Sequence, residues 1–166
     1  KSLYTEEIQN SSLDRKILFL VSLETKQKRY RIQVITPLVN EEQSRLIKER
    51  LKTKLNPDEN VQVGCRIDFS NKKKGSIKFS AHGLADVVKD KIVYELKFVS
   101  ELTHEHFLQC ASYVVAMDLP KGILWNTRDN TLYEIEVTDR KAFLDAVAKT
   151  VTKGMIENYY EPIRKS

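Results

Sequence analysis

The chain has 166 residues and a formal net charge of +5, and 41% of its residues are hydrophobic and 31% charged. This size and composition favour one globular domain, and five glycines and four prolines are too few for a low-complexity chain. No apolar run approaches the roughly 20 residues that a membrane-spanning helix needs. The positive charge permits a nucleic-acid partner without requiring one.

The cysteines and the first residue bear on where the chain works. Cys65 and Cys110 lie in apolar stretches and do not form a disulfide framework. We therefore expect an intracellular, reducing compartment, either cytoplasm or nucleus. The chain begins with Lys1 rather than Met. We expect a single domain with its core at about 41–157, excised from a larger protein.

The N-terminal part predicts a strand hairpin. Two stretches, 16–23 (KILFLVSL) and 28–36 (KRYRIQVIT), are rich in the apolar and β-branched residues of strands. The polar residues 25–27 between them suggest the turn. The second stretch alternates in a way that fits a strand with one better-buried face.

The middle of the chain predicts one helix followed by a series of strands. Asn40 is a good N-cap for a helix over 41–55, which Pro57 ends. The apolar stripe of this helix contains Leu46, Ile47, Leu51 and Leu55. The strands that we expect next are 61–69, 76–80, 83–88 and 91–98.

The last third predicts a helix, a second hairpin and a final helix. Thr103 can cap the first of these helices, which would run to about Met117. The hairpin would join strands at 122–126 and 132–137, and Asp139 would cap the final helix. The apolar face of the final helix would contain Phe143, Val147, Val151 and Met155. This order predicts an α/β fold, a mixed central β-sheet flanked by helices, with the N-terminal strand hairpin added.

Three charged side chains share one face in the expected sheet. If residues 89–90 form a two-residue turn, Asp86 lies opposite Val93. Side chains alternate along a strand, so Val93, Glu95 and Lys97 lie on the same face as Asp86. Asp86 and Glu95 would then be diagonal neighbours, roughly 7–8 Å apart at the backbone. Their carboxylates could converge on one ion.

The types of these residues suit metal-assisted chemistry. Mg²⁺ takes hard oxygen ligands and keeps several waters, so two carboxylates leave room for a phosphate. The metal acidifies a bound water, and a nearby lysine can stabilise developing negative charge. The ordinary alternative is two exposed acids and a lysine on a half-solvated strand. An aspartate inside the apolar run GLADVV is less ordinary, because a carboxylate without a partner is costly there.

The spacing of these residues resembles a known nuclease signature. Gly83-x-x-Asp86 followed by Glu95-x-Lys97 is similar to the motif of the PD-(D/E)XK nuclease superfamily, although Ala85 stands where many members have proline. The resemblance covers residues 61–137. It implies a restriction-endonuclease-like core and a Mg²⁺- or Mn²⁺-dependent nuclease.

The resemblance also implies roles for particular residues. Asp86 and Glu95, together with the backbone carbonyl of Leu96, would bind the metal, and Lys97 would assist catalysis beside the two acids. Many relatives add an acid from a helix before the first core strand. Glu49 is our candidate for that ligand, and a plain surface acid is the alternative.

A second motif lies in the helix after the lysine. Gln109 and Tyr113 are similar to the Gln-x-x-x-Tyr motif of the RecB/Cas4/Dna2-like branch, and their spacing places them on one helical face. His106 lies one turn earlier on that face. The resemblance implies that the glutamine and tyrosine position nucleic acid or the catalytic lysine. A basic cluster that could contact phosphate, or could be a solvated loop, consists of Lys72, Lys73 and Lys74.

The expected activity is hydrolysis of phosphodiester bonds in DNA, as a deoxyribonuclease with a role in DNA repair or strand processing. Single strands or ends are expected as substrate, more than RNA, with an attached or associated helicase or other domain and no membrane. The alternative is an inactive PD-(D/E)XK fold that binds nucleic acid or a partner protein. In a third possibility the motif match is accidental.

Overall fold

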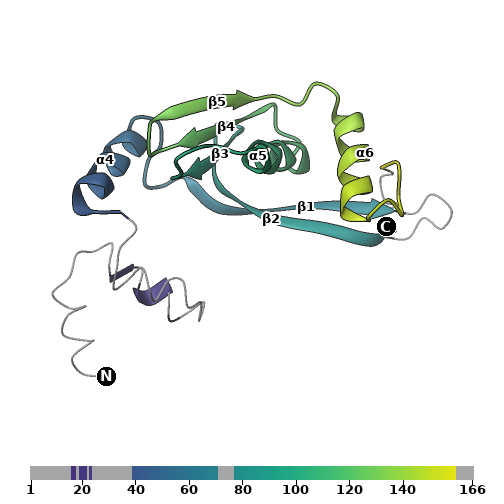
Figure 1. Ribbon diagram of the computed structural model, residues 1–166, viewed down its shortest axis with the longest axis horizontal. Helices are drawn as coiled ribbons and strands as arrows, with labels where there is room; N and C mark the ends of the chain where they lie inside the picture. Colours follow the sequence, from purple (N-terminus) through teal and green to yellow (C-terminus); the bar gives the residue numbers. More distant parts are fainter. Residues whose placement is uncertain (1–15, 18, 22, 24–38, 71–76, 160–166) are drawn as a thin grey trace. The chain divides into compact units, whose positions relative to one another are not determined.

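The computed structural model describes residues 16–17, 19–21, 23, 39–70 and 77–159 (Figure 1). The chain divides into two units, residues 1–48 and 49–166, and the sheet belongs to the second. The described elements are α4 (Glu41–Lys52), β1 (Asn60–Ser70), β2 (Ile77–Lys89), β3 (Ile92–Lys97), α5 (His104–Ala116), β4 (Lys121–Asn126), β5 (Thr131–Ile135) and α6 (Arg140–Val151). Among the described residues, no helix has the length and apolar character needed to cross a membrane.

The first predicted strand, over 16–23, is wrong. Residues 16–17, 19–21 and 23 are helical. A short apolar run has no hydrophobic period that distinguishes a strand from a helix. The strand prediction therefore depended on residue type alone, which is not decisive. The second predicted strand, 28–36, lies outside the described residues.

Helix α4 begins as the sequence predicts. The Asn40 side-chain oxygen Oδ1 accepts a hydrogen bond from the Gln43 N–H at 2.8 Å. In return, the Asn40 N–H donates to Gln43 Oε1 at 2.9 Å. This reciprocal capping box satisfies backbone donors that the first helical turn leaves free. The helix ends at Lys52, three residues before its predicted end.

The sheet has five strands in the order β1-β2-β3-β4-β5. β3 and β4 pair in parallel, and the other neighbouring pairs are antiparallel. The parallel pair needs a crossover connection, which α5 provides. The two strands that the sequence predicts over 76–88 form one continuous strand, β2. The mixed sheet flanked by helices is the fold class predicted from the sequence.

The turn between β2 and β3 differs by one residue from its prediction. Lys89 pairs with Ile92, so the two turn residues are Asp90 and Lys91 rather than 89–90. Both turn residues have positive φ, 50° and 62°. This is the backbone that a two-residue antiparallel hairpin requires, because its twist matches that of the strands.

The two faces of the sheet pack against different partners. On one face, Val93 is buried with Tyr113 and Val114 of α5, and the β1 residues Ile67 and Phe69 are buried with Ala148 of α6. On the other face, Tyr94 packs with Val87 and Trp125, and Leu51 and Leu55 from the end of α4 and the segment after it cover this group. Helices α5 and α6 therefore cover one face, as Figure 1 shows for α5.

Helix α6 is capped as predicted but buries a different face. Asp139 accepts a hydrogen bond from the Ala142 N–H at 2.9 Å. The residues that face the sheet are Leu144, Val147 and Ala148, whereas Val151 and Met155 are exposed. The predicted face is therefore right for Val147 and wrong for Val151 and Met155, and the fully buried residue of the helix is the small Ala148.

Candidate active site

Asp86 lies where β2 separates from β3. The ladder between these strands ends at the pair Val87 and Tyr94, and one further step of the same register would place Asp86 opposite Glu95. The register that the predicted diagonal arrangement needs is therefore not present, and Asp86 and Glu95 are not paired in the ladder. Asp86 Oδ2 accepts a hydrogen bond from the Leu96 N–H at 2.8 Å, so the side chain replaces a missing backbone partner of β3.

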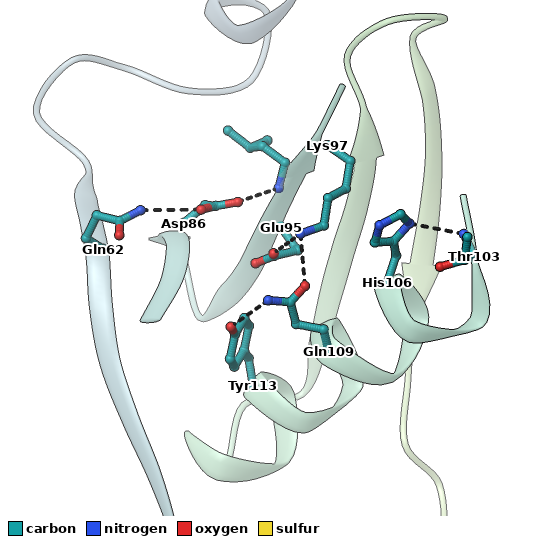
Figure 2. Close-up of polar contacts among 9 residues, drawn as sticks. Gln62, Asp86, Glu95, Lys97, Thr103, His106, Gln109 and Tyr113 are labelled. Carbon is teal, nitrogen blue, oxygen red and sulfur yellow. Dashed lines mark hydrogen bonds and ion pairs between the residues drawn. The ribbon is translucent and has the colours of Figure 1, made fainter. Parts of the chain in front are cut away.

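Glu95 and Lys97 project from β3 on the side of α5, as strand alternation predicts. The Lys97 ammonium lies 2.7 Å from Glu95 Oε1 and donates a second hydrogen bond to Gln109 Oε1 at 2.9 Å. Figure 2 shows the Asp86, Glu95 and Lys97 side chains converging on one region. Their common face results from the period of two along a strand.

Helix α5 completes a chain of polar contacts. Gln109 receives the Lys97 hydrogen bond and donates from Nε2 to the Tyr113 hydroxyl at 2.9 Å (Figure 2). Gln109 and Tyr113 therefore do lie beside Lys97, as their four-residue spacing predicts. A Cβ added to Gly83 would lie 2.5 Å from a carbon of the Tyr113 ring. The glycine of the Gly83-x-x-Asp86 motif thus makes room for this tyrosine.

Glu95 is a buried carboxyl with an unmet hydrogen-bonding need. Its residue is 2% exposed, and its Oε2 atom has no hydrogen-bond partner. Burial raises the pKa of Glu95, the bond from Lys97 opposes that rise, and the negative charge of Asp86 adds to it, while the Lys97 charge and the Asp86 backbone N–H lower it. The Asp86 N–H thus lies near the carboxyl, although it makes no hydrogen bond of normal geometry to Oε2. A buried oxygen without a partner is costly, and it is a common mark of a ligand that the fold is built to accept.

These donors fit a hard divalent cation. Two carboxylates face one region, and one of their buried oxygens is free to accept. The Leu96 carbonyl leaves β3 on the same edge as its N–H, which points at Asp86. Within the described ranges, no three acidic, histidine or cysteine side chains are gathered as a metal cluster. The structure therefore does not bring the exposed Glu49 together with the two acids.

The remaining predicted site residues lie at the margin or outside the described chain. The His106 ring accepts a hydrogen bond at Nδ1 from the Thr103 N–H, at 3.0 Å (Figure 2). His106 therefore takes the place of the acidic residue usual in a capping box at the start of α5. The three lysines Lys72, Lys73 and Lys74 lie outside the described residues.

Two buried polar residues, the last residue of β4 and the one after it, hold the end of β3, and sequence reasoning missed both. The Lys97 carbonyl accepts hydrogen bonds from the Thr127 N–H at 2.8 Å and the Thr127 hydroxyl at 2.9 Å. The Asn126 side chain donates to the Val99 carbonyl at 2.8 Å and accepts from the Val99 N–H at 3.2 Å. The signal in the sequence is an Asn-Thr pair directly after the apolar run that forms β4.

A family comparison matches the region that carries this site. The sequence model of the PD-(D/E)XK nuclease superfamily matches residues 43–138. The solved crystal structure of SSO0001 aligns with a TM-score of 0.50 at 20% sequence identity, covering 82% of this chain and 70% of that chain. At that identity, the likeness to SSO0001 concerns the fold alone. No curated protein matches the chain.

Proposed function

Because the chain belongs to the PD-(D/E)XK nuclease superfamily, we propose that it is a metal-dependent nuclease that hydrolyses phosphodiester bonds in DNA. One observation carries this proposal. Buried Glu95 has a carboxylate oxygen without a partner, and the Asp86 carboxylate and the Lys97 ammonium lie beside it. A purely structural acid at this depth would have both oxygens satisfied.

The metal would be Mg²⁺ or Mn²⁺, held by the carboxylates of Asp86 and Glu95 and the carbonyl of Leu96. When bound, such an ion acidifies water and neutralises charge on a phosphate. Asp86 keeps its orientation through the bond from the Leu96 N–H. Lys97 is held between Glu95 and Gln109 and is only 19% exposed in its side chain. Its ammonium would stabilise negative charge that develops on the phosphate.

Gln109 and Tyr113 would act on the lysine. The amide oxygen of Gln109 accepts from the ammonium, and the tyrosine hydroxyl accepts from the amide nitrogen of Gln109. These two hydrogen bonds fix the rotamer of Gln109. The position of its amide oxygen in turn fixes the position of the Lys97 ammonium. The arrangement supports the RecB/Cas4/Dna2-like branch as the finer assignment, in which His106 and Lys72, Lys73 and Lys74 would contact nucleic acid.

Cleavage assays on purified protein test the activity. Single-stranded, duplex and flapped DNA, and RNA of the same sequences, would be incubated with Mg²⁺, with Mn²⁺ or with EDTA. We expect cleavage of DNA that needs either metal and stops in EDTA. Metal binding by a folded protein that cleaves none of these substrates would instead favour the inactive binding fold.

A matched pair of variants connects the activity to the site. Asp86→Asn keeps an oxygen for the Leu96 N–H but removes the charge, so both metal binding and cleavage should fall. Asp58→Asn changes an exposed aspartate in the loop before β1 and should behave like the unaltered protein. If the two variants cleave equally well, the assignment of the site to Asp86 is wrong.

A further inference from the structure

The pairing of β1 with β2 is interrupted beside Asp86. Val61 pairs with Val87 and Val63 pairs with Ala85, but the intervening residues Gln62 and Asp86 do not pair. Gln62 has a φ of 50° near the start of β1, a left-handed backbone that residues with a Cβ rarely adopt.

The same interruption changes the side-chain pattern of β2. Residues two apart on a regular strand share a face. Ala85, however, is buried with Val93 on the side of α5, whereas Val87 is buried with Tyr94 on the other side. The strand therefore twists locally at Asp86, and this twist turns the aspartate side chain toward β3.

Two donors from the two neighbouring strands hold the Asp86 carboxylate. Gln62 Nε2 of β1 donates to Oδ1 at 3.3 Å, and the Leu96 N–H of β3 donates to Oδ2 at 2.8 Å (Figure 2). With one donor on each oxygen, the carboxylate plane is fixed. A single donor would leave the group able to rotate about its terminal bond.

We propose that Gln62 is a positioning residue for the metal site. Its amide holds Asp86 in the orientation that binds the cation, and the left-handed backbone at Gln62 is the conformation that aims this amide across the strand pair. Strained backbone persists where the surrounding structure requires it, and it gathers at functional sites. This inference rests on the proposed function, because it assigns to Gln62 a task in the same metal site.

The backbone of Gln62 provides an unusual test. Glycine adopts positive φ without strain, so Gln62→Gly should keep or raise the melting temperature while it removes the amide. We would measure the dissociation constant for Mn²⁺ by titration calorimetry, without substrate, together with thermal melts of each variant. Val61→Ala, at the neighbouring exposed position of β1, is the matched control, and Asp86→Asn is the reference for a lost ligand.

We expect Gln62→Gly to bind Mn²⁺ about three- to tenfold more weakly at an unchanged or higher melting temperature. Val61→Ala should keep the affinity of the unaltered protein. Gln62→Gly combined with Asp86→Asn should bind no more weakly than Asp86→Asn alone, because the amide acts through the aspartate.

The outcomes separate the two proposals. Unchanged Mn²⁺ affinity in Gln62→Gly, with weaker binding in Asp86→Asn, would overturn the role of Gln62 and leave the proposed function standing. A lower melting temperature in Gln62→Gly that accounts for its weaker binding would also overturn it, since the role would then be structural. If Asp86→Asn binds Mn²⁺ like the unaltered protein, the metal site itself is wrong.

Discussion

Two buried polar side chains lie on neighbouring strands of the sheet, and their surroundings differ. Asn126, at the end of β4, is 1% exposed and exchanges hydrogen bonds with Val99 through both its oxygen and its nitrogen. Glu95, on β3, is 2% exposed, has one oxygen bound to Lys97 and leaves the other without a partner. The two residues are equally buried, yet only the asparagine has partners on both of its polar atoms.

Under the proposed function, the difference separates a polar group that stabilises the fold from one that would bind a metal ion. A buried polar group with all partners in place is neutral or favourable for folding, whereas an orphaned one opposes it. Asn126 and Thr127 hold the end of β3 in place. The unpartnered oxygen of Glu95 opposes folding, and the proposed cation would satisfy it. Changes at the asparagine should therefore alter stability, and changes around the glutamate should alter activity.

Lys97→Ala should have the largest effect. Loss of one electrostatic group at the reacting phosphate lowers a cleavage rate by about 10²–10³. The melting temperature should also fall, because the buried Glu95 carboxylate loses its ion-pair partner, so the rate is measured per folded molecule well below the melting temperature. Rates and thermal melts would be compared with Lys121→Ala, another strand lysine paired with a glutamate, at 2.9 Å. Full-rate cleavage by folded Lys97→Ala would contradict the mechanism.

Asn126→Ala should alter stability alone. It leaves the Val99 N–H and carbonyl without their partners, at a cost of about 2–3 kcal/mol. The melting temperature should fall by about 4–12 °C. Cleavage per folded molecule, measured well below the melting temperature, should match the unaltered protein. A loss of rate at full stability would show that the asparagine belongs to the active site.

Glu95→Gln should stabilise the metal-free protein. Removal of a buried charge at a functional site typically gains about 1–2 kcal/mol, or about 2–8 °C in melting temperature here. Metal should no longer raise the melting temperature of this variant, whereas it should raise that of the unaltered protein. Thermal melts in EDTA and in Mn²⁺ would measure both effects. A melting temperature in EDTA below that of the unaltered protein would show that the buried charge of Glu95 does not oppose folding.

The gain from Glu95→Gln should depend on pH. Burial holds the pKa of Glu95 above its ordinary value in the folded chain, so folding favours the protonated carboxyl. That contribution is complete below the unfolded-state pKa, at about pH 4. It is lost as the pH rises through the folded-state pKa. The melting temperatures of variant and unaltered protein should therefore be closest near pH 4 and separate as the pH rises.

Tyr113→Phe should have the smallest effect. It removes the acceptor of the Gln109 amide but leaves Gln109 in contact with Lys97. The ring that packs against Gly83 is also retained. Cleavage should fall by about two- to tenfold, the equivalent of one net hydrogen bond, with little change in stability. Tyr133→Phe, at a half-exposed tyrosine of β5, is the matched control and should cleave normally.

Sequence patterns predicted most of the elements from α4 onward because each of them has a clear local signal. The capping residues Asn40, Thr103 and Asp139 mark three helix starts, and the strands alternate or form short apolar runs. The predicted turn between β2 and β3 lies one residue too early in the chain. The sequence does not distinguish the two positions, because Lys89-Asp90 is as turn-like as Asp90-Lys91. The strand predicted over 16–23 is wrong, and the described residues there are helical, because this short apolar run has no decisive period.

The candidate site was predictable where it depends on strand alternation or helical spacing. Glu95 and Lys97 share a face in any register, so their position beside α5 follows from the strand alone. The position of Asp86 depends on the interruption of β2 at that residue, which alternation does not predict. The contacts that depend on distant strands were not predictable. Gln62 and Thr127 reach the site through pairings that no local pattern contains.

The parallel pairing of β3 and β4 has a consequence for how such a protein can diversify. Lys97 and Asn126 form the last pair of these strands. The segments that follow β3 and β4 therefore both leave the sheet at its same end. The exposed residues 100–101 and 128–130 follow at that end of the sheet, where Asn130 Oδ1 accepts a hydrogen bond from the buried Trp125 indole at 3.1 Å. Insertions at 100–101, which carry no such contact to the core, would change the surface beside Lys97 while the sheet stays unchanged. Substrate preference and catalytic chemistry can therefore evolve, or be engineered, as separate traits.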